Sequence, residues 1–261
     1  LARGDKVIAT ARNTAKLEDL KSRGALATAL DVMWPDEAMK QTLDLAISVY
    51  GRIDILVNNA GYFLEGAVEE CSAEEALQQF STNVFGVLTV CRAVLPYMRA
   101  NKTGVVANVG SVAGWRGRAD AGLYCASKAA VAVLSESLRA DVAHLGIEVT
   151  VIEPGYFRTS LLTSGHVVAA NQIPDLEPAT APIKATFAAN VGKESGDPAK
   201  AAMLIVETLT KTGRCEGRRI PARLAVGKDA VAFENAVLQL RRQELDEWAE
   251  LVSTTDFADK K

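Results

Sequence analysis

Short apolar runs alternate with longer amphipathic segments along most of the chain. The run at 53–57, for example, is apolar apart from one aspartate and stops at Asn58-Asn59-Ala60-Gly61, as expected of a strand buried on both faces. The same pattern predicts strands at 6–12, 25–32, 53–57, 104–111 and 147–153, with helices from residue 14 and at 35–51, 73–100 and 121–145. Strict alternation of strand and helix requires a parallel sheet covered on both faces, so we expect a doubly wound α/β fold.

The regular alternation ends at Pro154. Residues 156–197 contain three prolines and three glycines and have no strand pattern. Long insertions of this kind in compact domains are usually functional, so we expect 156–196 to form a lid over the substrate within a single domain spanning 1–261. Beyond it the sequence predicts a helix at 198–210, a short strand near 219–222, a helix at 229–251 and a frayed end at 258–261.

Composition excludes several function classes. The net charge is −3, from 29 Lys and Arg against 32 Asp and Glu, and the basic residues are scattered, which argues against a nucleic-acid partner. The longest apolar stretch, 84–96, is shorter than the roughly 20 residues of a membrane-spanning helix. Four cysteines without a C-x-x-C pair indicate free thiols in a reducing compartment, and we expect a cytoplasmic protein. Two isolated histidines do not suggest a zinc site, so no metal is expected.

Tyr124 and Lys128 lie four residues apart on a predicted helix, and therefore on one face. A nearby ammonium favours a phenolate, so the spacing predicts a lowered tyrosine pKa and a role in proton transfer. The Y-x-x-x-K pattern alone is common by chance, but its position in the chain strengthens the prediction of a functional site. Ser111 ends the preceding strand, while 58–61 and 154–155 end neighbouring strands, and ligands in open α/β sheets bind beyond such ends.

Taken together, Asn58-Asn59-Ala60-Gly61, Asn83, Ser111, Tyr124-x-x-x-Lys128 and Pro154-Gly155 resemble the short-chain dehydrogenase/reductase family in its ordinary, non-extended branch. The resemblance covers essentially the whole chain. It implies a Rossmann-like, three-layer α/β/α fold with a nicotinamide cofactor across the strand ends. The related epimerases and dehydratases are usually longer and carry a different cofactor loop, so chain length argues against them.

The resemblance assigns catalytic roles by position. Tyr124 would be the general acid or base at the carbonyl oxygen, and Ser111 would hydrogen-bond that oxygen. Lys128 would lower the tyrosine pKa and bind the nicotinamide ribose. Asn83 would hold a water in a proton relay.

It also assigns cofactor contacts. Asp31 and Val32 would lie at the adenine, Asn58 at its ribose, and Ala60 and Gly61 would allow a close backbone approach. The segment after Pro154 and Gly155 would grip the carboxamide, with Phe157 and Thr159 in it. The first strand ends at Arg12 with no acidic residue, a pattern that favours the 2′-phosphate of NADP(H) over NAD(H), although Arg12 as a solvated surface residue stays an alternative.

One departure from the family pattern is large. The glycine-rich turn T-G-x-x-x-G-x-G is absent, and 1–4 reads as the last turn of a helix. We therefore expect a first strand and its turn, about 25–30 residues, to precede Leu1, because strands on either side would otherwise lack their shared partner. The alternative is a non-catalytic member of the fold, either a truncated pseudoenzyme or a nucleotide-sensing regulator.

Substrate and assembly are less constrained. The apolar residues of 156–196, with Trp115, predict a hydrophobic carbonyl compound or secondary alcohol as the small-molecule substrate, or else simply pack the lid onto the body. The helices at 73–100 and 121–145 are apolar on more than one face, which fits either deep burial or, as the resemblance implies, a homodimer or homotetramer interface.

Overall fold

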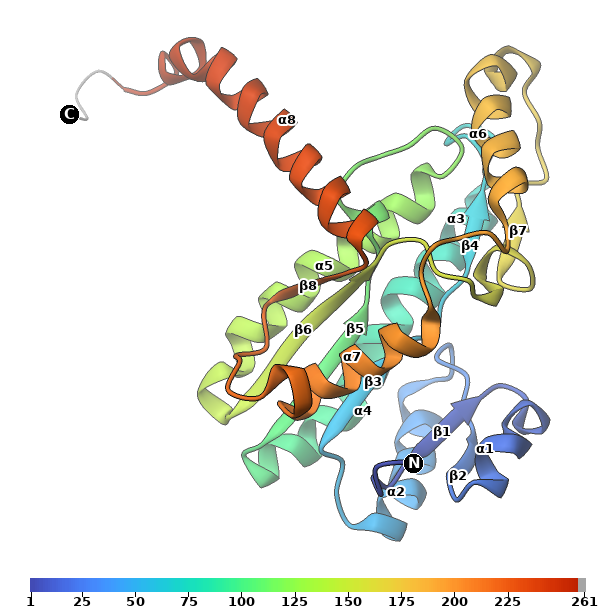
Figure 1. Ribbon diagram of the computed structural model, residues 1–261, viewed down its shortest axis with the longest axis vertical. Coiled ribbons are helices and arrows are strands. Elements are labelled where there is room, and N and C mark those ends of the chain that lie inside the picture. The colour runs from blue at the N-terminus through green and yellow to red at the C-terminus, as the bar shows by residue number, and fades with distance from the viewer. Residues whose placement is uncertain (258–261) are drawn as a thin grey trace.

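Four parallel strands form the main sheet of the computed structural model, which describes residues 1–257 (Figure 1). Their order is β3 (Ile55–Asn58), β5 (Gly104–Val109), β6 (Ile147–Pro154) and β8 (Arg223–Val226). All three neighbouring pairs are parallel. The expected doubly wound α/β architecture is confirmed, and the carboxyl ends of these strands lie along one edge of the sheet.

The N-terminal strands form a sheet of their own. β1 (Ile8–Ala11) pairs in parallel with β2 (Leu26–Ala29), and the short helices η1 (Thr14–Leu17) and α1 (Glu18–Ser22) connect them. Among the described residues, neither β1 nor β2 pairs with β3. Residues 1–4 form a turn in which the Gly4 amide donates to the Leu1 carbonyl at 2.9 Å, and Gly4 has a φ of +87°.

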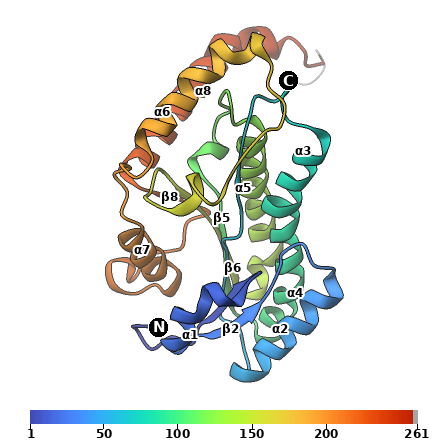
Figure 2. The ribbon, with the colours of Figure 1, turned by 90° about the vertical axis from the view of Figure 1, so that its right-hand side faces the viewer.

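Helices cover both faces of the main sheet (Figure 2). α2 (Asp36–Tyr50) and α4 (Gly86–Asn101) pack on one face together with α5 (Gly122–Val142). Their contact centres on fully buried side chains such as Met39, Met98 and Val106, each contributing roughly 1.5–3 kcal/mol by burial. On the other face, α7 (Pro198–Thr210) places Leu209 against Ala107 and Ile152.

The helix predicted at 73–100 is confirmed with one interruption. α3 (Ala73–Phe80) begins at a capping box formed by Ser72 and Glu75, and continues through a π-helical turn, η2 (Ser81–Phe85), into α4. A π-turn inserts one extra residue per turn and often marks a functional position. Here it carries Asn83.

Two sequence predictions were wrong. The segment 156–196 contains a strand, β7 (His166–Val168), which pairs in parallel with β4 (Phe63–Glu65), in addition to η5 (Ser160–Leu162), η6 (Pro174–Leu176) and α6 (Glu177–Asn190). Strands of three residues are too short to show an alternating pattern. The strand expected at 219–222 lies at β8 instead, followed by α8 (Lys228–Ser253). Residues 258–261 lie outside the described part of the chain.

Candidate active site

A cavity of about 820 Å³ opens at the carboxyl ends of the central strands. It brings together segments that are far apart in the sequence: the loop after β3, the segment after β5, the start of α5, the segment 156–196 and the base of α8. Of the residues predicted to act in catalysis or cofactor binding, eight line it: Gly61, Ser111, Tyr124, Lys128, Pro154, Gly155, Phe157 and Thr159.

Tyr124 and Lys128 share one face of α5, as their spacing predicted. Tyr124 is buried, with 6% of its surface exposed, and Lys128 Nζ lies 5.8 Å from the centroid of its ring. Lys128 is also buried, and its Nζ donates a hydrogen bond of 2.8 Å to the Val109 carbonyl at the end of β5. Burial lowers the pKa of Lys128 to about 8, because removing the ammonium from water disfavours its charged form.

The expectation that Lys128 lowers the tyrosine pKa is wrong for this structure. Burial raises the pKa of Tyr124 to about 12, and the neighbouring Ser111 hydroxyl lowers it only in part. Desolvation of the phenolate outweighs the favourable charges around it. Tyr124 is therefore a neutral phenol at physiological pH, able to donate a proton.

Ser111 lies where β5 ends. Its extended backbone places it at the N-cap of a short 3-10 helix, η3 (Val112–Gly114), and its Oγ accepts the Ala113 amide at 3.1 Å. This bond fixes the hydroxyl at the cavity wall near Tyr124. The position agrees with the predicted role of Ser111 beside the reacting oxygen.

Asn83 is buried behind the cavity rather than on its wall. Its Oδ1 accepts the Tyr62 amide and its Nδ2 donates to the Tyr62 carbonyl, both at 3.0 Å. Nδ2 also lies 3.3 Å from Ser127 Oγ. These contacts tie the loop after β3 to the π-helical turn and to α5, so in this structure Asn83 positions the cavity floor.

Side chains at the end of β3 divide between core and cavity. Asn58 turns into the core, where its Nδ2 donates to Asn108 Oδ1 at 2.8 Å. Ala60 and Gly61 are exposed, and a Cβ atom on Gly61 would lie 3.2 Å from Asn83 Oδ1 and 3.7 Å from Lys128 Nζ. Glycine at 61 therefore leaves open the space in front of the lysine.

The end of β6 forms the opposite wall. A Cβ atom on Gly155 would approach Asp229 Oδ2 to 2.3 Å, so a side chain there would displace the Asp229 carboxylate. The same oxygen accepts the Tyr156 amide at 2.7 Å, which holds the segment carrying Phe157 and Thr159 against the base of α8.

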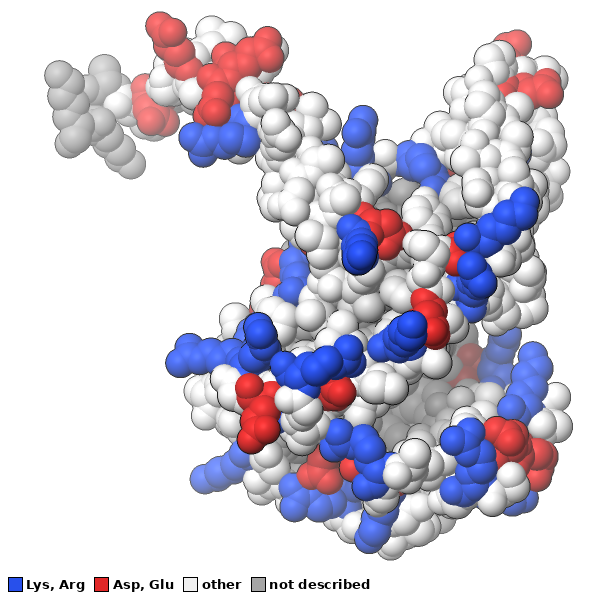
Figure 3. Space-filling view, in the orientation of Figure 1, with Lys and Arg blue, Asp and Glu red and all other residues white. Residues whose placement is uncertain are grey.

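Arg12, Asp31 and Val32 lie outside the cavity, at the N-terminal sheet. Arg12 is exposed just after β1. Asp31 Oδ1 accepts the Met33 amide at 3.0 Å, and Val32 packs against α4 beside Gly86. Figure 3 shows this face of the molecule hollowed between the N-terminal unit and the body. An extended ligand along the strand ends could therefore reach both the cavity and these residues.

Sequence reasoning missed several cavity residues, namely Tyr62, Phe63, Arg116, Arg118, Glu194, Asp229 and Phe233. None stands in a recognisable motif. Of the predicted lid residues, Tyr156, Leu161, Leu162 and Phe187 line the cavity, whereas Val167 and Val168 are half exposed. Trp115 does not face the cavity; the Arg223 guanidinium stacks 4.2 Å from its ring centroid.

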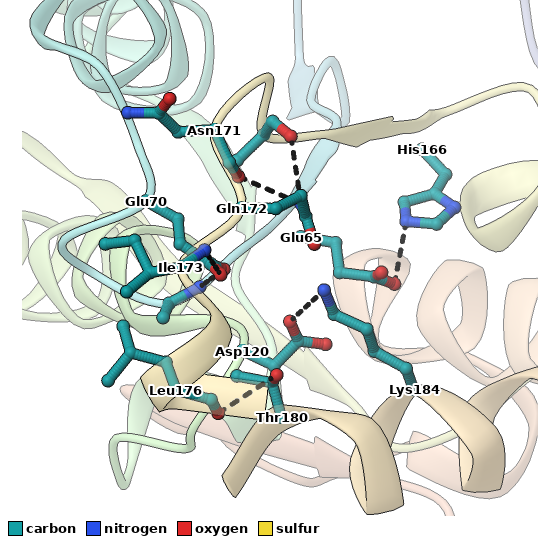
Figure 4. Close-up of polar contacts among 12 residues, drawn as sticks. Glu65, Glu70, Asp120, His166, Asn171, Gln172, Ile173, Leu176, Thr180 and Lys184 are labelled. Atoms are coloured by element: carbon teal, nitrogen blue, oxygen red, sulfur yellow. Dashed lines mark hydrogen bonds and ion pairs between the residues drawn. The ribbon is translucent and has the colours of Figure 1, made fainter. Parts of the chain in front are cut away.

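Two polar contacts, the second of them an ion pair, join residues 156–196 to the body beside this cavity (Figure 4). His166 Nε2 of β7 lies 3.0 Å from Glu65 Oε2 of β4, and Lys184 Nζ of α6 lies 3.5 Å from Asp120 Oδ1. The Asp120 side chain is fully buried, and burial, reinforced by the Glu65 charge, raises its pKa to about 6. Across residues 1–257, no group of three or more His, Cys, Asp or Glu side chains is arranged to hold a metal ion.

The sheet, the strand-end cavity and its buried tyrosine and lysine define a dinucleotide-dependent α/β enzyme. Residues 1–166 match the family model described as short chain dehydrogenase. The chain is 38% identical over 222 residues to the uncharacterized oxidoreductase YusZ of Bacillus subtilis, covering 81% of this chain and 78% of that protein. It therefore belongs to the short-chain dehydrogenase family and is a NAD(P)-dependent dehydrogenase/reductase.

Solved structures agree with this assignment. A short-chain dehydrogenase from Streptomyces avermitilis superposes with a TM-score of 0.86 at 38% identity, over 98% of this chain and 92% of that one. A gluconate 5-dehydrogenase from Burkholderia cenocepacia, solved with NADP and tartrate, has a TM-score of 0.58 at 28% identity, over 62% and 66% of the two chains. The comparisons do not favour the alternative of a non-catalytic member of the fold.

Proposed function

We propose that this protein reduces a hydrophobic carbonyl compound to a secondary alcohol with NADPH, with Tyr124 as the general acid. The observation that carries the proposal is the meeting of Ser111, Tyr124 and Lys128 in one cavity at the strand ends. An acid, a hydrogen-bond donor and a cation around one reacting oxygen form the set needed to stabilise the charge that develops there.

The protonation state of Tyr124 supports its role as the acid when the reaction runs towards the alcohol. With a pKa raised to about 12, the phenol keeps its proton at neutral pH and can donate it to the carbonyl oxygen. Alcohol oxidation would need the phenolate, which burial disfavours. Ser111 donates a second hydrogen bond to the same oxygen, and Lys128 supplies positive charge behind the tyrosine.

The residues present fit a nicotinamide cofactor. Gly61 and Gly155 both line the cavity without a side chain, and Lys128 Nζ lies beside Gly61 with the Val109 carbonyl as its hydrogen-bond partner. A bound cofactor supplies the hydride. Lys128 would bind its ribose, Phe157 and Thr159 its carboxamide, and Asp31, Val32, Asn58 and Ala60 the adenine side.

The preference for NADP(H) rests on Arg12. Its guanidinium is exposed at the end of β1, with no acidic side chain paired to it in the described residues, so it is available to a 2′-phosphate. The NADP in the gluconate 5-dehydrogenase structure supports this choice.

The substrate class rests on the lid. Phe63, Leu161, Leu162, Phe187 and Phe233 make the cavity wall predominantly apolar. Residues 156–196 act as the lid in this proposal, excluding water from the reacting carbonyl.

Two further points follow the family. Leu77, Phe85 and Val133 on α3, the π-turn and α5 are more than half exposed, which supports a homodimer or homotetramer through these helices.

The four cysteines are all free, which supports a reducing compartment such as the cytoplasm. No helix in the described part of the chain has the length and apolarity to cross a membrane.

The test is a pair of measurements on one variant. Tyr124→Phe removes the proton donor and keeps the ring packing, so carbonyl-dependent NADPH oxidation should fall at least about a hundredfold, while NADPH binding, followed by fluorescence, should stay within about twofold. Tyr62→Phe, on the same cavity, is the matched control. Turnover by Tyr124→Phe close to that of the wild type would overturn the proposal. Nucleotide binding without turnover by any carbonyl in the wild-type chain would favour a sensing role.

A further inference from the structure

The C-terminal helix α8 leaves the body of the protein halfway along its length. Its base packs against the sheet through Ala230 and Val237, the only buried residues in the helix. From Leu238 onward, all side chains except that of Leu240 are exposed. Figures 1 and 3 show the outer half standing free of the rest of the molecule, on the side opposite α6. We call residues 238–253 the arm.

The arm carries an apolar stripe that no residue in the described part of the chain covers. Leu238, Leu245, Trp248 and Val252 are each more than half exposed, at 53, 67, 55 and 55%. The intervals of seven, three and four residues place all four side chains on one face of the helix. Solvent-facing stripes of this kind mark contact surfaces.

The arm cannot fold back to bury this stripe on its own body without breaking the helix. Residues 228–253 contain neither glycine nor proline. Interrupting an unkinked helix costs several backbone hydrogen bonds, and no sequence feature lowers that cost. Residues 1–237, as the structure places them, therefore do not supply the covering surface.

The charges around the stripe favour a second copy of the same arm as the partner that covers it. Arg242 and Asp246 flank the stripe on one side, and Arg241, whose Nη1 lies 2.7 Å from Glu244 Oε2, lies within it between Leu238 and Leu245. When two such helices run antiparallel with their midpoints at Leu245, Leu238 of each faces Val252 of the other. Within each arm Arg242 Nε already lies 3.0 Å from Asp246 Oδ2, and the same register sets the two such pairs side by side, so that Arg242 of each copy also faces Asp246 of the other.

A parallel arrangement lacks this match. It would bring Arg241 of one copy against Arg241 of the other and would set Asp246 against the acidic side of the second helix at Glu244. Like charges at close range oppose that pairing. The antiparallel register also separates the two bodies, because each helix tip reaches only the point where the other arm leaves its own body.

We propose that α8 is a dimerisation arm that pairs antiparallel with α8 of a second copy, through Leu238, Leu245, Trp248 and Val252. The contact is distinct from the apolar surfaces of α3 and α5. It does not depend on the proposed reductase activity.

Cysteine cross-linking tests both the contact and its direction. Leu245→Cys lies at the two-fold axis, so mild oxidation of the purified full chain should give a disulfide-linked dimer in at least half of the protein. Leu238→Cys alone should give none, whereas an equilibrated mixture of Leu238→Cys with Val252→Cys should give mixed dimers. Wild-type protein, with its four native cysteines, is the control.

Exchanging the charges at positions 242 and 246 tests whether the two arms pair in this particular register. Arg242→Asp should reduce cross-linking of Leu245→Cys at least fivefold, and adding Asp246→Arg in the same chain should restore it. Circular dichroism and NADPH binding of each variant check that the body is intact. Self-cross-linking of Leu238→Cys would show a parallel pair, and no cross-linking at Leu245→Cys in folded protein would show that the arms do not meet. Either result overturns the proposal.

Discussion

The ring of Phe63 meets the ring of Tyr124 edge-on, with centroids 5.0 Å apart and planes at 73°. Phe63 belongs to β4, which pairs with β7 of the segment 156–196, and its ring also lies 5.4 Å from the His166 ring and 6.1 Å from that of Phe187. His166 and Phe187 of the segment 156–196 and Tyr124 of α5 therefore all pack around one phenylalanine ring.

Phe63→Leu should slow catalysis while changing the free energy of unfolding only slightly. The leucine keeps most of the buried volume at a cost of about 1 kcal/mol in the free energy of unfolding, but it removes the edge-to-face contact, worth about 1 kcal/mol. We expect kcat to fall several-fold with cofactor affinity unchanged, measured by steady-state kinetics and NADPH fluorescence. Phe80→Leu, away from the cavity, is the control. An unchanged kcat would show that Tyr124 does not depend on this contact.

Lys128→Met should abolish turnover and stabilise the fold. Burial lowers the pKa of the Lys128 ammonium to about 8 from 10.5. The buried charge therefore destabilises the folded state at every pH below 8. That cost is relieved as the pH rises from 8 to 10.5. Methionine, which also loses the bond to Val109, should raise the free energy of unfolding by about 1 kcal/mol at pH 7. Urea unfolding at pH 7 and at pH 10 measures the difference, which should shrink at the higher pH; a variant less stable than wild type at pH 7 would contradict this account.

Asp120→Asn should stabilise the protein in a pH-dependent way. The pKa of Asp120 is raised to about 6 from 3.8, so its buried charge destabilises the fold above pH 6, and protonation relieves this between pH 6 and pH 4. The variant should be more stable by about 1 to 3 kcal/mol at pH 7 and equal to wild type at pH 4. Asparagine also tolerates the φ of +67° at this position. A gain of the same size at both pH values would point to packing instead of charge.

Arg12→Ala should change cofactor choice. Loss of the guanidinium should weaken NADPH binding at least about tenfold, an energy of about 1.4 kcal/mol, and leave NADH binding unchanged. Arg23→Ala, on the same N-terminal unit, is the matched control because its guanidinium lies 3.5 Å from Asp19. Fluorescence titrations with NADPH and NADH measure both affinities. Equal weakening of NADPH and NADH binding would show that Arg12 does not contact the 2′-phosphate.

Sequence alone predicted the main sheet and the residues at its strand ends. The β-α alternation set parallel strands, and Ser111, Tyr124 and Pro154 stand next to strand and helix boundaries that the pattern already marked. Asp229 could not be found in this way. It lies 73 residues after Tyr156, whose amide its carboxylate accepts, and no local pattern connects the two.

The order of strands, helices and strand-end motifs was thus determined by the sequence, because periodicity and turn chemistry act over a few neighbouring residues. Only the tertiary structure decided the electrostatics of the site. Tyr124 and Lys128 have the spacing of a phenolate and its cation, yet both are buried, and the pKa of each moves towards its uncharged form. Desolvation depends on every atom packed around a group, and those atoms come from the whole chain.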